Sequence, residues 1–249
     1  MLHRTEGIVI RGTDYGENSK IITIFTEKFG KVGVMARGAK KTGSRHGAVI
    51  QLFTYADYMF FRSGGRMGTL SQGEVLASHR RLREDLLLSA RASYLAELTD
   101  RLTDDGEPAP GLFGQLRLAF AALEEGKDAQ IITHLYEMKM LSHAGYAPNL
   151  ERCAVCGGEP SGYAVSIRGG GAVCPVCRAR DPEAVQMTEK AFKLLSVLAR
   201  ADIGNIGRIE VRPETKAQLK TVMRGLIDTH IGIRWRSRHV MEQMEKYGM

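Results

Sequence analysis

The 249-residue sequence lacks any long uninterrupted apolar segment. A helix needs about 18–20 consecutive apolar residues to cross a bilayer, so we expect no membrane-spanning helix. The first residues, Met1-Leu2-His3-Arg4-Thr5-Glu6, are mostly polar and lack the apolar stretch of a signal peptide. We therefore expect a cytoplasmic protein, in which cysteines stay reduced.

Motifs for nucleotide or ester chemistry are also missing. The segment Gly38–Arg45 has the glycine spacing of a phosphate-binding loop, but Ser44 stands where a lysine is required. There is no Gly-x-Ser-x-Gly turn, and the seven histidines never recur at the spacing of a metal-binding helix. These absences favour a protein that is not an enzyme.

The net charge of +7 is divided unevenly along the chain. Residues 1–83 hold 14 Lys and Arg against 6 Asp and Glu, a net charge of +8. Residues 84–185 have a net charge of −6, and residues 186–249 one of +5. A basic first third favours a polyanionic partner, although a merely solvated basic surface is the alternative. We expect the acidic middle to face away from nucleic acid or to contact proteins.

Short β-branched segments separated by turn signals fill the first 80 residues. They lie at residues 7–10, 20–26, 31–36, 54–61 and 67–74, and residues 45–52 fit one or two helical turns. Five strands with a short helix between the third and fourth have the order of an OB-fold barrel, although other small barrels fit nearly as well.

Helical periodicity begins near Glu84. Apolar residues recur every three or four positions in three segments, the last of which ends near Gly145, a suitable C-cap. The pattern returns in residues 190–201, 214–231 and 237–247, with Pro213 suited to a first helical position and Ser237 to an N-cap. We interpret these helices as one bundle that an insertion at residues 150–185 interrupts.

Two Cys-x-x-Cys pairs lie in that insertion, separated by 17 residues. Two cysteines three apart in a tight turn can direct both sulfurs at one ion, so two such turns supply a tetrahedral zinc site. A redox motif would need only one pair. The candidate ligands are Cys153, Cys156, Cys174 and Cys177, and four thiolates leave no position for a catalytic water, so the zinc should be structural. Residues 163–173 between the pairs suit a hairpin.

Basic residues of the first third are candidates for contacts with nucleic acid. They begin strands, lie in a glycine-containing loop or flank the Gly64-Gly65 turn. The same third contains eight aromatic residues, and a cationic groove with aromatic faces holds single strands without reading their sequence. About half of these aromatics should instead fill the barrel. The candidates are Lys20, Lys31, Arg37, Lys40, Lys41, Arg45, Arg62 and Arg66.

Several short segments together resemble the RecO family of bacterial DNA repair proteins, over essentially the whole chain. The junction of Ser142–Pro148 with the first cysteine pair resembles that family's approach to its zinc site. The other matching segments are residues 6–10, 14–17, 25–31, 36–41, 44–45 and 236–238.

The resemblance implies an α+β protein with an N-terminal OB-fold barrel and an α-helical domain that carries a four-cysteine zinc-binding insertion. It implies binding and annealing of single-stranded DNA, contact with double-stranded DNA and association with the bacterial nucleoid. With RecR, such proteins help load RecA onto strands coated with single-strand-binding protein. The four cysteines carry over as zinc ligands and Arg37, Lys40, Lys41 and Arg45 as a DNA-contacting loop, although some family members lack the cysteines.

This resemblance and the residue patterns together predict four segments. These are an OB-fold domain at 1–80, a first helical part at 81–150, a zinc-ribbon-like insertion at 151–185 and a second helical part at 186–249. Two other classes of function remain open: a zinc-ribbon adaptor that acts only through protein contacts, and an enzyme, either a nuclease or a nucleotide-dependent remodeller.

Overall fold

The structure is a computed structural model that describes residues 1–63 and 67–247, with side chains as far as Met244. Its contacts divide the chain into two compact units. The first contains residues 1–126 together with 235–249, and the second contains residues 127–234. None of the described helices is long and apolar enough to span a membrane.

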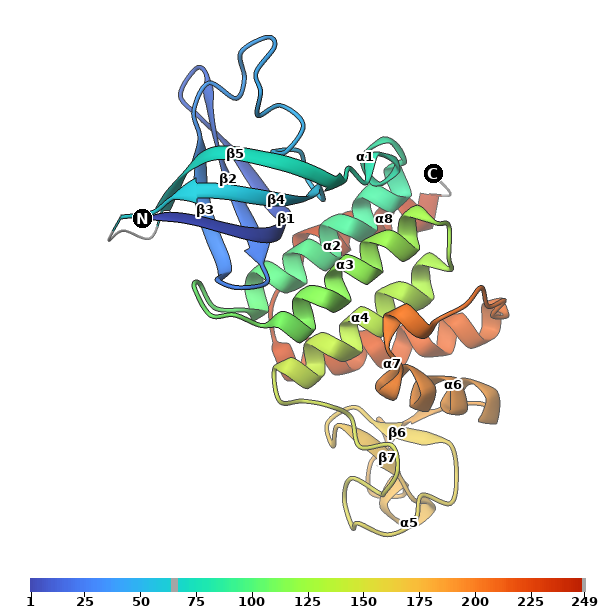
Figure 1. Cartoon of the computed structure of the whole chain (residues 1–249). Helices are drawn as coiled ribbons and strands as arrows, with labels where there is room; N and C mark the ends of the chain where they lie inside the picture. Colours follow the sequence, from blue (N-terminus) through green and yellow to red (C-terminus); the bar gives the residue numbers. More distant parts are fainter. Residues whose placement is uncertain (64–66, 248–249) are drawn as a thin grey trace. The chain divides into compact units, whose positions relative to one another are not determined.

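Five strands of the first unit close into a barrel in the order β1, β2, β3, β5, β4 (Figure 1). Strand β1 pairs with both β2 and β4, and a register shift between Val9 and Arg11 bends it around the barrel. Strands β3 and β5 run parallel, while the other pairs are antiparallel. This topology confirms the OB fold. The strands are β1 (Leu2–Tyr15), β2 (Ser19–Thr26), β3 (Gly30–Ala36), β4 (Tyr55–Phe61) and β5 (Met67–Ala77).

Side chains that alternate along the strands fill the barrel. Ile22, Ile24 and Val34 are buried there, and so are the aromatic rings of Tyr58 and Phe60. By contrast, the rings of Tyr15 and Phe61 are exposed. The eight aromatic residues of this region are therefore divided between the interior and the surface, as the alternation of a strand requires.

The predicted helical turns at residues 45–52 are wrong. These residues lie in a long loop from 37 to 54, whose backbone makes tight turns such as Gly47 N–H to Ser44 O, 3.0 Å. Val49 and Ile50 enter the barrel core, and Tyr58 donates its hydroxyl proton to the Val49 carbonyl at 2.7 Å. Anchoring to the barrel thus replaces the hydrogen bonds that a helix would make.

Four helices complete the first unit: α1 (Arg80–Glu84), α2 (Leu86–Leu102), α3 (Pro110–Glu124) and α8 (Arg236–Tyr247). Asp85 caps α2 by accepting a hydrogen bond from Leu88 N–H. The predicted N-cap role of Ser237 is wrong, because α8 already begins at Arg236. Ser237 instead donates its hydroxyl proton to Glu97 of α2, which fixes the start of α8 against that helix.

The second unit contains three long helices, α4 (Ala129–His143), α6 (Glu189–Arg200) and α7 (Pro213–Ile231), which pack against one another. Helix α4 ends at His143, close to the predicted Gly145, which follows the cap residue Ala144 and has a φ of +83°. Tyr146 N–H reaches back to Leu141 O at 2.8 Å and Gly145 N–H to Ser142 O at 3.1 Å. These two bonds form a Schellman motif, which satisfies the last carbonyls of the helix.

A small sheet follows α4, with strands in the order β7, β6, β8. Its strands are β6 (Ala164–Ser166), β7 (Gly171–Val173) and β8 (Val185–Gln186), and the short helix α5 (Pro175–Arg178) and the 3-10 turn η1 (Ile203–Asn205) complete the unit. β6 and β7 form the predicted hairpin, whose turn contains Gly170 at φ +64°. Contacts place α8 in the first unit rather than in one bundle with α4, α6 and α7.

Candidate nucleic-acid interface and metal centre

The four cysteines lie together, with all Sγ atoms within 4.8 Å of one another. The Sγ atoms of Cys156 and Cys174, one from each pair, are 3.8 Å apart. A tetrahedron with metal–sulfur bonds of about 2.3 Å has sulfur–sulfur edges of about 3.8 Å. The donor set therefore fits one tetrahedral metal ion.

Backbone hydrogen bonds position the first cysteine pair on the β6–β7 hairpin. Ala154 N–H donates to Ala172 O and Ala172 N–H to Asn149 O, both at 2.7 Å. Gly171 must be glycine here, since a Cβ atom would lie 2.2 Å from the Asn149 carbonyl oxygen. The pair then turns back on itself, with Cys153 N–H donating to Gly158 O.

Local donors favour a thiolate at Cys153. Burial opposes ionisation of this thiol, but backbone N–H groups of Cys156, Cys174 and Val155 outweigh it and lower its pKa to about 6. Hydrogen bonds with the sulfurs of Cys156 and Cys174 raise the pKa of Cys177 to about 12. A cation bound at the centre would displace such shared protons, because coordinated thiols are deprotonated.

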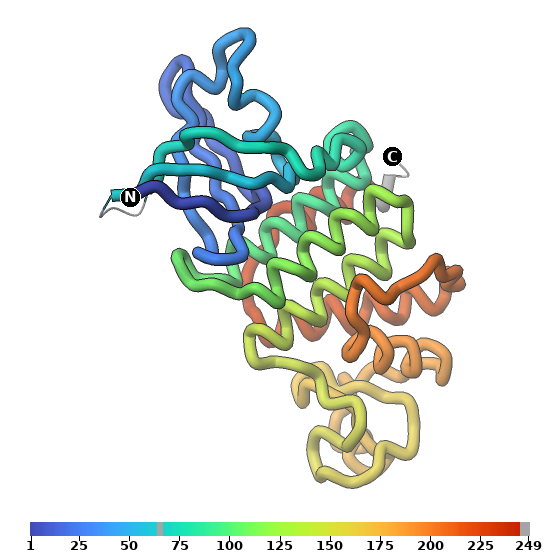
Figure 2. Tube along the Cα trace, in the orientation of Figure 1, coloured from blue at the N-terminus to red at the C-terminus, as the bar shows by residue number. Residues whose placement is uncertain are grey.

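Four predicted DNA contacts lie at one end of the barrel. In the strand register, Lys20 pairs with Ala36, the last residue of β3. The loop that follows carries the side chains of Arg37, Lys40 and Lys41, which are exposed, and it extends from the same end of the barrel as the β1–β2 turn (Figure 2). The start of β2 and the loop after β3 thus lie at the same end of the barrel, and we call their four basic residues the basic rim (Lys20, Arg37, Lys40 and Lys41).

Ordered contacts hold the loop beside the β1–β2 turn. Lys40 N–H donates to Asn18 O at 3.1 Å, and the Lys40 ammonium pairs with Asp14 at 2.9 Å. The hydrogen bond and charge of Lys40 lower the pKa of the Asp14 carboxyl group. Arg45 lies farther along the loop, where its Nε donates to His46 Nε2 at 3.4 Å.

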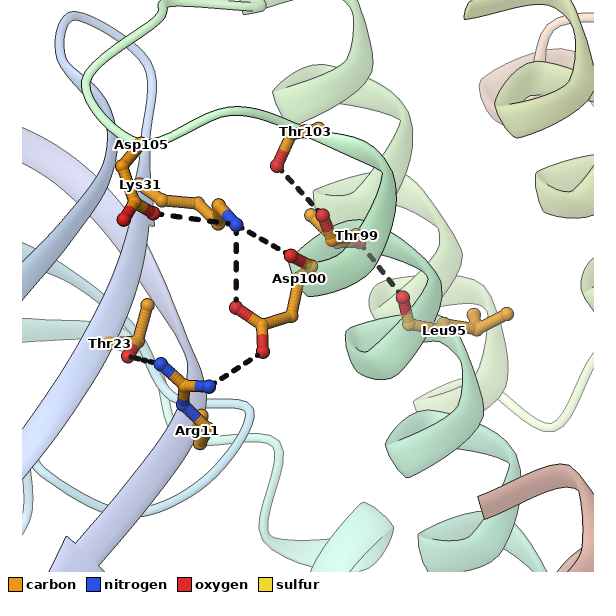
Figure 3. A network of polar contacts seen from close by, with 8 residues as sticks. All are labelled: Arg11, Thr23, Lys31, Leu95, Thr99, Asp100, Thr103 and Asp105. Atoms are coloured by element: carbon orange, nitrogen blue, oxygen red, sulfur yellow. Dashed lines mark hydrogen bonds and ion pairs between the residues drawn. The ribbon is translucent and has the colours of Figure 1, made fainter. Parts of the chain in front are cut away.

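Lys31 is placed differently from the other predicted contacts. Its side chain is only 9% exposed, and its ammonium lies 3.6 Å from Asp100 and 3.4 Å from Asp105. It also donates to the Asp100 carbonyl at 2.5 Å. Figure 3 shows this network, in which Arg11 approaches the other oxygen of Asp100 at 3.0 Å. The charge of Lys31 therefore joins β3 to α2 and its following loop.

The remaining two predicted contacts belong to the β4–β5 connection. Arg62 is partly exposed, and its carbonyl accepts a hydrogen bond from the N-terminal amine at 2.8 Å. Arg66 and the Gly64-Gly65 turn lie outside the described residues. The start of β1 pairs with the end of β4, so Arg62 lies beside the start of β1 rather than in the basic rim.

A cavity in the first unit, lined by three arginines, was not foreseen from the sequence. Its volume is about 380 Å³, and Arg11 of β1, Arg101 of α2 and Arg236 of α8 line it. Glu97 and Asp100 also line it, and so does Phe53 near the end of the long loop. Its charged residues come from three separated elements, so no local motif could reveal it.

Two family models match nearly the whole chain. The model described as "Recombination protein O N terminal" matches residues 1–79, and "Recombination protein O C terminal" matches residues 83–239. A DNA repair protein RecO of Halalkalibacterium halodurans is 41% identical over 248 residues, which cover 100% of this chain and 97% of the relative. The proteins of the same name from Bacillus pumilus and Bacillus subtilis are 42% and 40% identical over 245 residues, covering 98% of this chain and 95% and 96% of the relatives.

Proposed function

Because the chain belongs to the RecO family of DNA repair proteins, we propose that it binds single-stranded DNA through its basic rim and anneals complementary strands. The observation that carries this proposal is that Lys20 and the loop with Arg37, Lys40 and Lys41 lie at the same end of the barrel. OB-fold barrels hold single strands in cationic grooves without reading bases. Arg45 extends the contact along the same loop.

Annealing in this proposal needs no enzymatic step. Cations of the rim neutralise phosphates on two strands and thereby lower their mutual repulsion. Base pairing supplies the free energy, so nucleotide hydrolysis is unnecessary. Glycines at 38 and 43, both with positive φ, allow the loop backbone to turn tightly between the cations.

The cysteine cluster holds one structural zinc ion in this proposal. Cys153, Cys156, Cys174 and Cys177 would all coordinate it, which joins the two turns of the insertion and stabilises the second unit. No open coordination position remains for catalysis. The cluster's sulfur spacing supports this assignment.

The protein partners follow from the family resemblance. We propose that the protein acts with RecR to help load RecA onto strands coated with single-strand-binding protein. Contacts with double-stranded DNA would use the same phosphate chemistry, since both forms present a line of negative charge. We assign these proteins no surface on the chain.

A strand-annealing assay without nucleotide tests the function directly. Labelled complementary strands are mixed with purified protein, and the duplex product and strand lengths are measured. Faster annealing of intact strands supports the proposal. Shortened strands would indicate a nuclease, and unchanged annealing would favour an adaptor that binds only proteins.

Substitution of the loop cations tests the basic rim. Replacing Arg37, Lys40, Lys41 and Arg45 by Ala should weaken binding equally for different sequences, because phosphate contacts carry no base information. The slope of log K against log salt should flatten by about 0.7 per lost contact, up to about 3 in all. Weakened binding with an unchanged slope would contradict the electrostatic account.

A matched control removes four exposed cations from helices of the second unit. Lys190, Lys193, Arg200 and Arg224 lie on α6 and α7, where Ala preserves helix propensity. This variant has the same change in net charge. It should retain the wild-type affinity and salt slope if the rim is the DNA site.

A further inference from the structure

The arginine-lined cavity of the first unit has more positive than negative charge available to a ligand. Asp100 is shared between two cations, since both Arg11 and Lys31 approach its carboxylate. Among the described side chains, Arg101 and Arg236 make no ion pair, and both residues are exposed. Two guanidinium groups thus remain for an anion from outside.

The second carboxylate of the cavity is also committed to the protein. Glu97 accepts hydrogen bonds from Arg236 N–H at 3.1 Å and Ser237 N–H at 2.9 Å, and from the Ser237 hydroxyl. It therefore caps the N-terminus of α8, and this helix end is not itself an anion site. The guanidinium groups are therefore the cationic groups of the cavity that remain for an anion.

The position of the cavity indicates which anion it receives. Leu52 and Phe53 line its wall, and they lie near the end of the loop that begins with Arg37, Lys40 and Lys41. A strand bound at the basic rim would meet the cavity by following this loop. The cavity volume of about 380 Å³ lies in the range of sites that enclose small ligands, roughly 300–1,000 Å³.

We propose that this cavity is a second phosphate-binding subsite for the same DNA strand, in which Arg101 and Arg236 each contact a phosphodiester. The inference rests on the proposed function, because it extends the path of the strand beyond the rim. Guanidinium groups suit this role, since each can donate two parallel hydrogen bonds to phosphate oxygens. Arg101 then provides a local basic contact within the acidic stretch 84–185.

Strand length separates the subsite from the rim. An OB fold covers roughly 4–16 nucleotides, so we compare labelled oligothymidines of about 4 and about 16 residues. The variant Arg101→Gln with Arg236→Gln should bind the short strand like wild type. It should bind the long strand more weakly, with a salt slope lower by about 1.4 for two lost contacts.

The substitutions are chosen to preserve the fold. Arg236→Gln keeps the backbone N–H that Glu97 accepts, and Gln suits the exposed last turn of α2 at position 101. A charge-preserving variant, Arg101→Lys with Arg236→Lys, should recover most of the salt slope. The single variant Arg101→Gln is remote from the α8 cap. Its salt slope should decrease by about half as much as that of the double variant.

A control removes two exposed cations that already have helical ion pairs, Arg80 with Glu84 and Lys193 with Glu189. Arg80→Gln with Lys193→Gln should bind both strands like wild type. An equal long-strand affinity and slope in wild type and Arg101→Gln/Arg236→Gln would overturn the subsite. Binding of polyglutamate, a model for an acidic protein, is measured with the same variants. If Arg101→Gln/Arg236→Gln binds DNA like wild type but no longer binds polyglutamate, the subsite is overturned in favour of an acidic protein partner.

The loop variant distinguishes failure of the subsite from failure of the function. If Arg37→Ala, Lys40→Ala, Lys41→Ala and Arg45→Ala together abolish short-strand binding while the cavity variant is unaffected, only the subsite is rejected. If wild type binds neither strand, the proposed function itself is rejected.

Discussion

Lys31 and Lys41 show how the surroundings of a lysine decide its role. Both belong to the basic first third, and sequence alone makes them equivalent candidates for DNA contact. Lys41 is exposed at the barrel end, whereas Lys31 is 9% exposed and faces Asp100 and Asp105. Removing one partner of a largely buried ion pair leaves the other charge buried without a counter-charge.

Lys31→Ala should therefore destabilise the protein by about 3 kcal/mol while leaving the salt slope of DNA binding unchanged. Lys41→Ala should do the reverse, with unchanged stability and a slope lower by about 0.7. Denaturant unfolding and binding titrations at several salt concentrations measure the two effects. A Lys31→Ala variant with wild-type stability and a flatter salt slope would instead indicate that Lys31 contacts DNA.

His79 should make the stability of the first unit depend on pH. Burial lowers the pKa of its imidazole, with Glu124 opposing and Arg83 reinforcing the shift. The folded protein therefore disfavours the charged form, and unfolding takes up a proton below about pH 6.5. Stability should be complete above that pH and decline as pH falls toward the lowered pKa, as it should for His46, which burial shifts the same way.

The variant His79→Asn should flatten this decline, because one of the two groups no longer titrates. Asn tolerates the left-handed backbone at this position, where φ is 44°. The slope of unfolding free energy should fall by up to about 1.4 kcal/mol per pH unit below pH 6.5. Identical slopes in variant and wild type would mean that His79 does not contribute.

The cysteines make the metal prediction at the residue scale. We expect about one zinc ion per chain, and Cys153→Ser with Cys174→Ser should abolish zinc binding and lower the melting temperature. Elemental analysis and thermal unfolding measure these outcomes. Substoichiometric zinc in protein prepared without chelators, or an unchanged melting temperature, would argue against a structural zinc.

At the scale of elements, strands and long helices could be predicted because their periodicity is local. The apolar stripe of α2 and the β-branched residues of β2 each lie within a short segment, and the two cysteine pairs give their spacing directly. The loop at 45–52 could not be predicted in this way. Val49 and Ile50 gain more from the barrel core than from a helix, which only the folded barrel can decide.

The arginine cavity was also beyond prediction, for a different reason. Arg101 and Arg236 belong to helices that are distant in sequence, and neither helix alone forms a concave surface. The packing of α8 against α2 also explains why Ser237, expected to be an N-cap, instead donates a hydrogen bond to Glu97. Sites assembled between elements depend on packing that no local pattern records.

The α2–α8 junction supplies a prediction at this scale. Glu97→Ala should remove the acceptor for two backbone N–H groups of α8 and cost about 1–2 kcal/mol, as loss of an N-cap does. Glu97→Gln keeps one acceptor oxygen and should cost less. Amide hydrogen exchange in residues 236–247 measures the effect. Exchange rates equal to those of wild type in both variants would show that the carboxylate is dispensable.

At the scale of the whole molecule, the first unit depends on a segment from the far end of the sequence. Trp235 is 3% exposed and contacts the buried ring of Tyr94 with centroids 6.2 Å apart. Trp235→Ala should destabilise this unit by about 3–5 kcal/mol. Hydrogen exchange along α2 would report the loss, and Val197→Ala on the exposed face of α6 serves as a control with little effect.

Because the first unit contains two separate segments of the chain, its parts are synthesised at different times. The barrel and α1–α3 leave the ribosome before residues 127–234, which at about 5–20 residues per second take roughly 5–20 s to translate. Throughout that interval Tyr94 has no Trp235 to cover it. A nascent chain therefore waits with an apolar face open to chaperones, and a chain whose translation stops early keeps that face open for proteases to recognise.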